Sequence, residues 1–216
     1  MLNKAKSHLK IFVNCKSLRL LFFDSFDIVK RRIDFLPEIK NVGARVRPIY
    51  DEDYDFQWGK IDYKGKTVLD LGADIGSTAD FFLRKGAKKV VAVEGSLENF
   101  RTLQTNASIL EGMIPMFLFI ERPSQIEKLI LQYDFDIVKM DIEGGEINLF
   151  TIKNEIFSKV PEYIIEVHSD KLFSLMLKKC AENNYKIISA KAWSPPVRIV
   201  YARKYQKPAR RRIFLF

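Results

Sequence analysis

The stretch Val68-Leu-Asp-Leu-Gly-Ala-Asp-Ile-Gly-Ser77 decides the fold of this chain of 216 residues. It begins as an apolar run typical of a buried strand, passes two glycines and leads into a segment with helical spacing. We predict that the helix begins near Ser77, because serine is a favoured N-cap residue. Glycine permits a tight turn and lets a ligand approach the backbone at the carboxyl end of a strand. The glycine spacing is neither that of the dinucleotide fingerprint nor that of a phosphate loop, so phosphates are not expected to be the main contact.

Downstream of this stretch, short apolar runs alternate with helical segments. The predicted strands cover residues 67–71, 89–94, 116–120, 136–141 and 162–168, and the predicted helices cover residues 77–85, 96–109, 124–133, 145–157 and 170–183. This alternation indicates βαβ units and a parallel sheet covered on both faces. The last runs, 185–192 and 197–203, are joined by a link too short for a crossover helix, so we expect an antiparallel hairpin. The predicted fold class is α/β: a Rossmann-like, doubly wound, mostly parallel sheet with an antiparallel C-terminal hairpin and an N-terminal helical extension.

The two ends of the chain differ in composition from its middle. Residues 22–33 carry an apolar stripe at helical spacing, and an acidic, aromatic segment follows at residues 50–56. We therefore interpret residues 1–60 as a helical cap, residues 61–205 as the main domain and residues 206–216 as a basic tail.

The charge of the chain is unevenly distributed. The 36 basic and 27 acidic side chains give a net charge of +9, and residues 183–216 hold nine basic side chains and no acidic one. Such a segment could bind RNA or another anionic partner such as a membrane surface, or serve only as a solubilising tail. Charge alone does not choose between these functions.

Several classes of protein are excluded by composition. The two cysteines, Cys15 and Cys180, lie far apart, which excludes a disulfide framework and a cysteine-based zinc site and favours a reducing, cytoplasmic location. With only two histidines, a histidine-rich metal centre is excluded as well. No run approaches the roughly 20 apolar residues that cross a bilayer, so we expect no transmembrane segment.

The glycine turn is followed by a carboxylate at a characteristic position. Glu94 ends the second predicted strand, 18 residues after Gly76. This order of elements resembles the cofactor signature of the class I S-adenosylmethionine-dependent methyltransferases. The resemblance implies that the turn holds the amino-acid end of S-adenosyl-L-methionine and that Glu94 accepts the hydroxyls of its ribose. The implied cofactor contacts are Asp70, Gly72, Ala73, Asp74, Gly76, Ser77, Glu94, Gly95, Ser96 and Asp141.

A second motif narrows the resemblance. The stretch Asp136-Ile-Val-Lys-Met-Asp-Ile-Glu-Gly-Gly-Glu146 resembles the signature of the FkbM-type methyltransferase family. Asp74 stands where that family more often has asparagine, and Gly95 stands where it usually has proline. The match covers about residues 68–168 and leaves both ends of the chain uncovered. Members of the family mostly methylate hydroxyl oxygens, often on sugars.

Three residues near the ends of predicted strands are candidates for the chemistry. Asp141 ends one strand, Glu143 follows it, and His168 ends the next strand, so all three should face the crevice at the sheet edge. A neutral histidine can accept a hydroxyl proton near neutral pH, so we predict His168 as the general base, with Asp141 and Glu143 orienting the acceptor or cofactor. We assign no metal site. The alternatives are a purely structural His168, helix capping by Glu143 and Glu146, and a Mg²⁺ ion held by Asp141, Glu143 and His168.

These residues favour a methyltransferase that acts on a hydroxyl oxygen of a carbohydrate or small-molecule acceptor by direct in-line transfer. The Asn-Pro-Pro-Tyr type of motif, found in amino-directed nucleic-acid methyltransferases, does not follow the fourth predicted strand. The set of two lysines, an aspartate and a glutamate that marks ribose 2′-O-methyltransferases is incomplete, since His168 stands where a lysine is expected. Two alternatives remain open: an RNA methyltransferase that uses the basic C-terminal region, and an inactive cofactor-binding scaffold.

Overall fold

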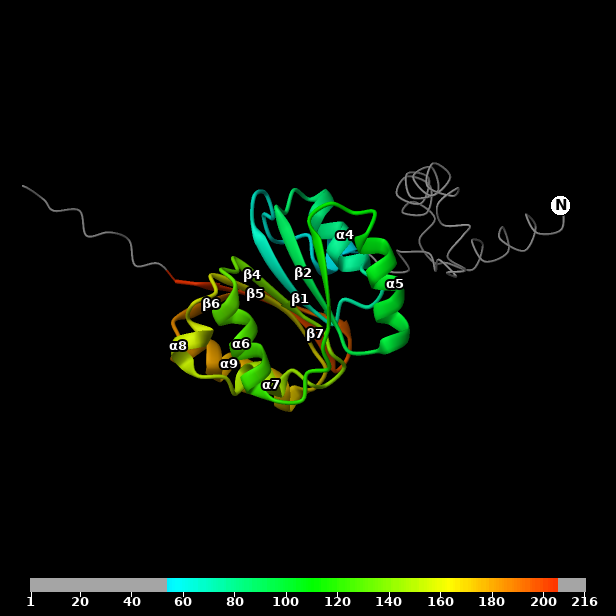
Figure 1. Cartoon of the computed structure of the whole chain (residues 1–216). Coiled ribbons are helices and arrows are strands. Elements are labelled where there is room, and N and C mark those ends of the chain that lie inside the picture. Colours follow the sequence, from blue (N-terminus) through cyan, green and yellow to red (C-terminus); the bar gives the residue numbers. More distant parts are fainter. Residues whose placement is uncertain (1–53, 206–216) are drawn as a thin grey trace, which may run out of the picture. The chain divides into compact units, whose positions relative to one another are not determined.

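A computed structural model describes residues 54–205 of the chain (Figure 1). Residues 1–53 and 206–216 lie outside the described residues. The predicted stripe at residues 22–33, most of the predicted cap and the predicted basic tail therefore carry no structural account.

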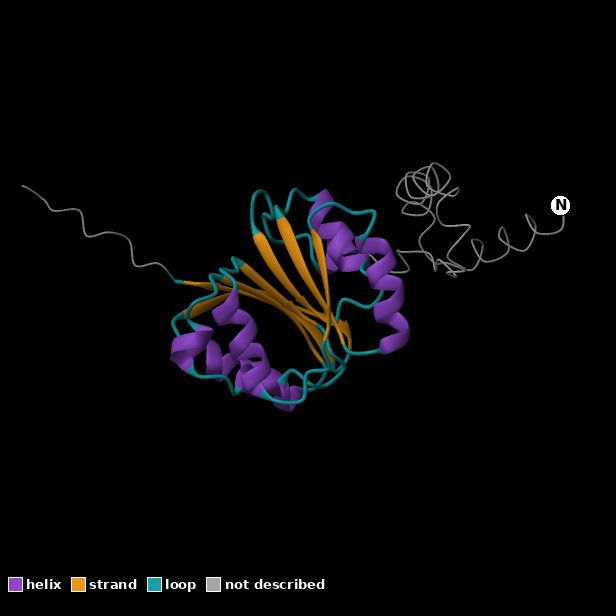
Figure 2. Cartoon of the chain, in the orientation of Figure 1, coloured by secondary structure: helices purple, strands orange, loops and turns teal. Residues whose placement is uncertain are grey.

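The described residues form a seven-stranded sheet in the order β3-β2-β1-β4-β5-β7-β6. The five strands β1 to β5 run parallel to one another, while β7 runs antiparallel to both β5 and β6. Figure 2 shows the strands as one twisted sheet with helices on either side. The predicted mixed sheet with a closing hairpin is thus confirmed. The strands are β1 (Thr67–Leu71), β2 (Lys89–Glu94), β3 (Met113–Phe117), β4 (Ile137–Met140), β5 (Glu162–Val167), β6 (Tyr185–Ser194) and β7 (Val197–Lys204).

The helices cover the sheet in two groups, with α4 and α5 on one side and α6 to α9 on the other (Figure 1). Within residues 54–205, no helix has the length and apolar character needed to cross a bilayer. The helices are α3 (Tyr54–Gln57), α4 (Ser77–Arg84), α5 (Leu97–Ala107), α6 (Pro123–Gln132), α7 (Ile147–Phe150), α8 (Asn154–Phe157) and α9 (Asp170–Glu182).

The two faces of the sheet have different interiors because successive strand residues point to opposite sides. On one face, Leu69 and Val91 belong to a continuous apolar core together with Leu129 of α6 and Met176 of α9. On the opposite face, two buried charged residues are neighbours. Asp70 of β1 is paired with Lys139 of β4, and both are 0% exposed. This pair lies at the topological switch point, where strand order reverses and where ligands of such sheets bind.

Two predicted elements and one predicted helix cap are wrong, whereas the predicted start of α4 near Ser77 is confirmed. The third strand is Met113–Phe117 rather than residues 116–120, and the predicted helix 145–157 is divided into α7 and α8. The N-cap of α4 is Gly76, with φ of 96°, and Ser77 is the first helical residue. Glycine adopts this left-handed conformation without the strain that a side chain would introduce, so the turn itself, not a side-chain cap, starts the helix.

The first described residues pack against the sheet domain. Trp58, 1% exposed, accepts a hydrogen bond at its carbonyl from the Tyr63 hydroxyl at 2.6 Å. Lys85 of α4 binds the Asp55 carboxylate at 2.6 Å. Residues 54–60, which the sequence assigned to the cap, are therefore part of the same packed unit as the strands that follow.

Candidate active site

A cavity of about 580 Å³ opens at the carboxyl edge of the parallel strands. Four loops build it, and they follow the four neighbouring strands β1, β2, β3 and β4. Its size is that of a small-molecule site, and its position is where this type of sheet binds ligands. The lining residues are Gly72, Asp74, Val93, Glu94, Gly95, Ser96, Asn99, Leu118, Phe119, Ile120, Asp141, Ile142, Glu143 and Gly145.

At Gly72 the loop after β1 lies directly against the backbone of the loop after β4. A Cβ atom on Gly72 would lie 1.7 Å from the Asp141 carbonyl oxygen, and the φ of Gly72 is 80°. Neither the space nor the backbone conformation accommodates a side chain. Asp74, two residues later, also has a positive φ of 49°, which aspartate and asparagine tolerate better than other side chains.

Glu94 connects the loops after β1 and β2. Its Oε2 accepts the backbone N–H of Asp74 at 2.9 Å, and its Oε1 accepts the backbone N–H of Ser96 at 2.6 Å. Each carboxylate oxygen has about two acceptor positions, so each can still accept one hydrogen bond from a ligand. The carboxylate is therefore held rigidly at the cavity wall with acceptor capacity to spare.

Asp70 and Lys139 form an ion pair beneath the cavity. The Lys139 Nζ lies 3.0 Å from Asp70 Oδ1 and donates to the carbonyl of Gly72 at 2.8 Å. Asp70 Oδ2 also accepts from the Thr78 hydroxyl at 2.5 Å, and both charged side chains are almost completely buried. Burial lowers the pKa of Lys139, but the carboxylates of Asp70 and Asp141 outweigh that effect, so the pKa is raised and the ammonium stays charged. Because the Lys139 ammonium binds both Asp70 and the Gly72 carbonyl, the pair holds the glycine turn after β1 in place.

His168 lies at the centre of a group of carboxylates beside the cavity. Its Nε2 is 3.4 Å from Glu143 Oε2, 3.7 Å from Asp141 Oδ1 and 3.8 Å from Glu166 Oε1. Its Nδ1 lies 2.9 Å from Glu146 Oε1. The three residues that the sequence predicted for the chemistry are thus brought together, with Glu146 and Glu166 added to them.

The carboxylates change the acid–base behaviour of His168. Burial lowers the pKa of the imidazole, but the charge and hydrogen bond of Glu146, with the charges of Asp141 and Glu143, outweigh burial and raise the pKa above its ordinary value. A histidine with a raised pKa is a stronger base once it is neutral, and it is neutral only above that pKa.

The same three side chains have a spacing that a cation could bridge. One ligand atom from each of Asp141, Glu143 and His168 lies within 4.8 Å of the other two. Exposed acidic groups often have such spacing without an ion, and Glu143 is an exposed side chain. The spacing is therefore compatible with the metal alternative and does not by itself favour it.

Not all of the predicted cofactor contacts reach the cavity. Asp70 is absent from the lining and instead forms the buried ion pair with Lys139. Ala73, Gly76 and Ser77 are absent from the lining as well. Apart from Asp141, the predicted contacts that line the cavity are Gly72, Asp74, Glu94, Gly95 and Ser96.

Sequence reasoning missed the apolar wall formed by Leu118, Phe119 and Ile120, because it assigned these residues to a strand. It also missed Lys139, although a lysine in an apolar strand is a usable signal, because lysine is almost never fully buried unless paired.

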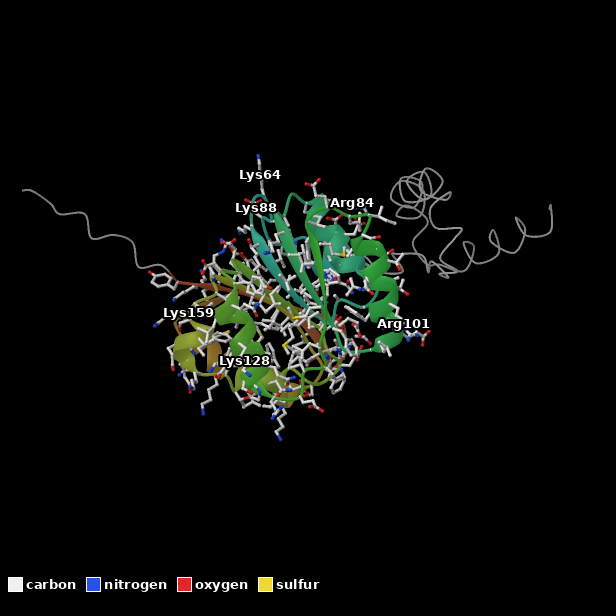
Figure 3. All side chains as sticks on the ribbon, viewed as in Figure 1. Lys64, Arg84, Lys88, Arg101, Lys128 and Lys159 are labelled. Carbon is white, nitrogen blue, oxygen red and sulfur yellow. The ribbon has the colours of Figure 1, made fainter. Side chains whose placement is uncertain are left out.

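The basic and aromatic residues near the C-terminus are only partly accessible. Tyr201, an aromatic residue of this segment, is 2% exposed and donates to Glu162 Oε2 at 2.5 Å. Arg203 lies 3.5 Å from the same carboxylate. Other basic side chains, among them Lys64, Arg101 and Lys128, are exposed and lie on different parts of the described chain (Figure 3). Residues 206–216 of the basic segment lie outside the described part of the chain.

Solved structures with similar folds are methyltransferases and a Rossmann-type protein. An S-adenosylmethionine-dependent methyltransferase from Mesorhizobium loti matches with a TM-score of 0.52 and 12% identity, over 71% of this chain and 99% of its own. Aeropyrum pernix fibrillarin, solved with bound S-adenosyl-L-methionine, matches with a TM-score of 0.52 and 15% identity over 66% and 68% of the two chains. A NADB-Rossmann superfamily protein from Streptococcus agalactiae gives a TM-score of 0.53 and 15% identity over 76% and 71%. At these identities the likeness establishes the fold alone, a Rossmann-like fold that these methyltransferases and the NADB-Rossmann protein share.

The sequence itself has relatives in viruses. No protein-family profile matches the chain. "Uncharacterized protein 158B" of Sulfolobus islandicus rod-shaped virus 1 is 33% identical over 139 residues, which span 62% of this chain and 82% of the relative. "Uncharacterized protein 65" of Sulfolobus islandicus filamentous virus (isolate Iceland/Hveragerdi) is 44% identical over 120 residues, which span 55% and 70%. The chain belongs to the family of these two Sulfolobus virus proteins and has a Rossmann-like fold.

Proposed function

We propose that this protein is an S-adenosylmethionine-dependent methyltransferase, similar to the FkbM type, that methylates a hydroxyl oxygen of a neutral carbohydrate or small-molecule acceptor. The observation that carries the proposal is the cavity at the carboxyl edge of β1 to β4, which adjoins a histidine surrounded by carboxylates. Within the chain, we assign residues 61–205, together with residues 54–60 that pack with them, to the catalytic domain, residues 1–53 to a cap and residues 206–216 to a basic tail.

The cavity residues fit the chemical groups of the cofactor. The remaining acceptor positions of Glu94 suit the two hydroxyls of a ribose, and the apolar wall of Leu118 to Ile120 suits a flat base. The carboxylates of Asp74 and Asp141 suit the positive charges of the amino-acid end. When bound, S-adenosyl-L-methionine would supply a methyl group on a sulfonium sulfur, and that sulfur would be the leaving group when a nucleophile attacks the methyl carbon in line.

We assign the acceptor side of the site to the residues around His168. His168 accepts the proton of the acceptor hydroxyl at Nε2, and Asp141 and Glu143 orient the acceptor. Three carboxylates within 3.8 Å of Nε2 repel an anionic group there, which favours a neutral hydroxyl over an acceptor with a nearby phosphate.

Methyl transfer is tested with a labelled cofactor. The purified full chain is incubated with S-adenosyl-L-methionine that carries a radioactive methyl group and with separate glycan, small-molecule and RNA fractions of the host. We expect label in a hydroxyl of a glycan or small molecule. Label in RNA alone would instead support the RNA methyltransferase, and cofactor binding without turnover in any fraction would support the inactive scaffold.

The substitution Glu94→Gln is expected to weaken the binding of S-adenosyl-L-methionine. One end of the new amide can only donate, so it cannot accept both a backbone N–H and a ribose hydroxyl, as the carboxylate does. A lost hydrogen bond to a charged group corresponds to a dissociation constant about 10–100 times higher. Isothermal titration calorimetry measures this, with Glu98→Gln, an exposed glutamate in the first turn of α5, as the matched control. Equal affinity of Glu94→Gln and wild type would remove Glu94 from the cofactor site.

Removal of divalent cations with EDTA is expected to leave the rate of methyl transfer unchanged. The proton acceptor that we propose is His168, and no step requires a metal to lower the pKa of the acceptor hydroxyl. The rate is compared before and after dialysis against EDTA, and again after addition of Mn²⁺. A rate that falls on dialysis and recovers with Mn²⁺ would replace the base assignment with the metal alternative.

A further inference from the structure

The side chain of Glu146 is a fully buried carboxylate for which the proposed function gives no role. It is 0% exposed and lies at the start of α7, five residues after Asp141. Its Oε1 lies 2.9 Å from His168 Nδ1 and accepts the backbone N–H of Gly144 at 3.1 Å. The sequence suggested helix capping for Glu146, but the side chain makes no capping hydrogen bond to α7.

A buried carboxylate requires compensation, because removing its charge from water costs several kcal/mol of desolvation free energy, on the order of the penalties seen for buried ions. Only one of the hydrogen-bond partners of Glu146 among residues 54–205 can carry a positive charge, and that partner is His168. The Oε2 of the same carboxylate has no hydrogen-bond partner within the described chain. The contact with the imidazole is therefore the main interaction that this carboxylate makes.

The contact also determines which ring nitrogen carries the proton. An ionised carboxylate can only accept, so the imidazole must donate from Nδ1. A neutral imidazole has one N–H, so Nε2 is then the bare nitrogen. That nitrogen is the one that faces Asp141 and Glu143, where the acceptor is expected to bind.

We propose that Glu146 is a positioning residue, which holds the Nδ1–H of His168 and thereby presents an unprotonated Nε2 to the acceptor hydroxyl. The Nδ1–H tautomer of His168 can be observed without any substrate, whereas the role of Nε2 as proton acceptor rests on the proposed function. In that reaction the oxygen forms a bond to the methyl carbon, the carbon–sulfur bond breaks with its electron pair left on sulfur, and the hydroxyl proton moves to Nε2. The imidazolium formed at this step is stabilised by Glu146, as in other carboxylate–histidine pairs.

The pH dependence of this arrangement follows from all the charged groups that face His168. These are Asp141 after β4, Glu143 in the following loop, Glu146 at α7 and Glu166 on β5. Each negative charge stabilises the imidazolium, so removing one lowers the pKa of His168. Turnover needs the neutral imidazole and rises with pH through that pKa. The rise should therefore move to lower pH when Glu146 loses its charge.

The chain contains only two histidines, so nuclear magnetic resonance can report on His168 directly. In ¹⁵N-labelled full-length protein with His8→Gln, the only imidazole signals come from His168. We expect the Nδ1–H tautomer when the ring is neutral. In the additional variant Glu146→Gln, whose amide oxygen can still accept both hydrogen bonds, we expect the pKa of His168 to fall by about one unit.

The outcomes separate this proposal from the proposed function. Glu155→Gln, an exposed glutamate on α8, is the matched control and should leave the tautomer and the pKa unchanged. An Nε2–H tautomer in the parent protein, or an unchanged pKa in a folded Glu146→Gln protein, would overturn the positioning role.

The kinetic arm uses the methyl-transfer assay. Glu146→Gln should lower kcat at least about tenfold, leave the KM for the cofactor unchanged and shift the acidic limb of the kcat profile to lower pH. If NMR shows the Nδ1–H tautomer and the lowered pKa but the wild type transfers no methyl group, the Glu146–His168 pairing stands and the proposed function fails. A kcat equal to that of wild type, with an unshifted acidic limb, would overturn the catalytic consequence while leaving methyl transfer intact.

Discussion

Replacement of Lys139 by methionine is expected to lower the free energy of unfolding by about 3–5 kcal/mol, because it leaves a buried carboxylate without its partner. Methionine resembles the lysine side chain in shape but carries no charge. Within residues 54–205, the Asp70 side chain would then keep the hydrogen bond from the Thr78 hydroxyl and lose its ion pair. The carbonyl of Gly72 would lose its donor as well. Urea unfolding followed by circular dichroism measures the change.

A double variant is the control for this prediction. In Lys139→Met with Asp70→Asn, no buried charge remains unpaired, so the loss of stability should be smaller than in Lys139→Met alone. Equal losses in the two proteins would mean that the ion pair is not the source of the effect. Asp70→Asn alone completes a double-mutant cycle, which measures the coupling between these two side chains in contact at 3.0 Å.

Replacement of His168 by alanine is expected to lower kcat by about 10²- to 10⁴-fold, the range that general acid–base catalysis contributes. The affinity for S-adenosyl-L-methionine should stay the same, since His168 is absent from the cavity lining. Single-turnover methyl transfer and calorimetry measure the two quantities separately. The chain offers its own control in His8→Ala, which changes the other histidine and should retain activity. Retained activity in His168→Ala would exclude the histidine as the base.

The fold was largely predictable because most of its strands coincide with short apolar runs, which can be recognised from neighbouring residues alone. The strands at Thr67–Leu71 and Lys89–Glu94 begin and end where the apolar runs do. The third strand is an edge strand, and there the signal failed: Pro115 lies within it, as an edge permits, while the apolar run continues past it to line the cavity.

The predicted helix at residues 145–157 is divided because of a contact distant in sequence. Lys179 of α9 donates to the carbonyl of Ile152 and to the side chain of Asn154. Those hydrogen bonds satisfy backbone and side-chain groups at the break between α7 and α8, so the helix need not continue. No spacing within residues 145–157 encodes that partner.

The chemical site was predictable to the extent that strand ends define it. Asp141, Glu143 and His168 meet at one edge because the carboxyl ends of β4 and β5 are neighbours in the sheet. The role of Glu146 was not predictable, because a glutamate near a helix start is ordinarily exposed and this one is buried against the imidazole. A contact between side chains of two different elements, here Glu146 at α7 and His168 after β5, is seen only in the packed structure.

The absence of a side chain at residue 72 has a consequence for how this protein can diverge. A single carbon atom there would collide with the Asp141 carbonyl oxygen at 1.7 Å. The turn after β1, which we propose faces the cofactor, and the end of β4, which we propose faces the acceptor, must therefore keep their relative positions. A change that moves either one displaces the other. New acceptor specificities, whether evolved or engineered, are therefore expected to arise by exchanging side chains around this junction rather than by inserting or deleting residues in it.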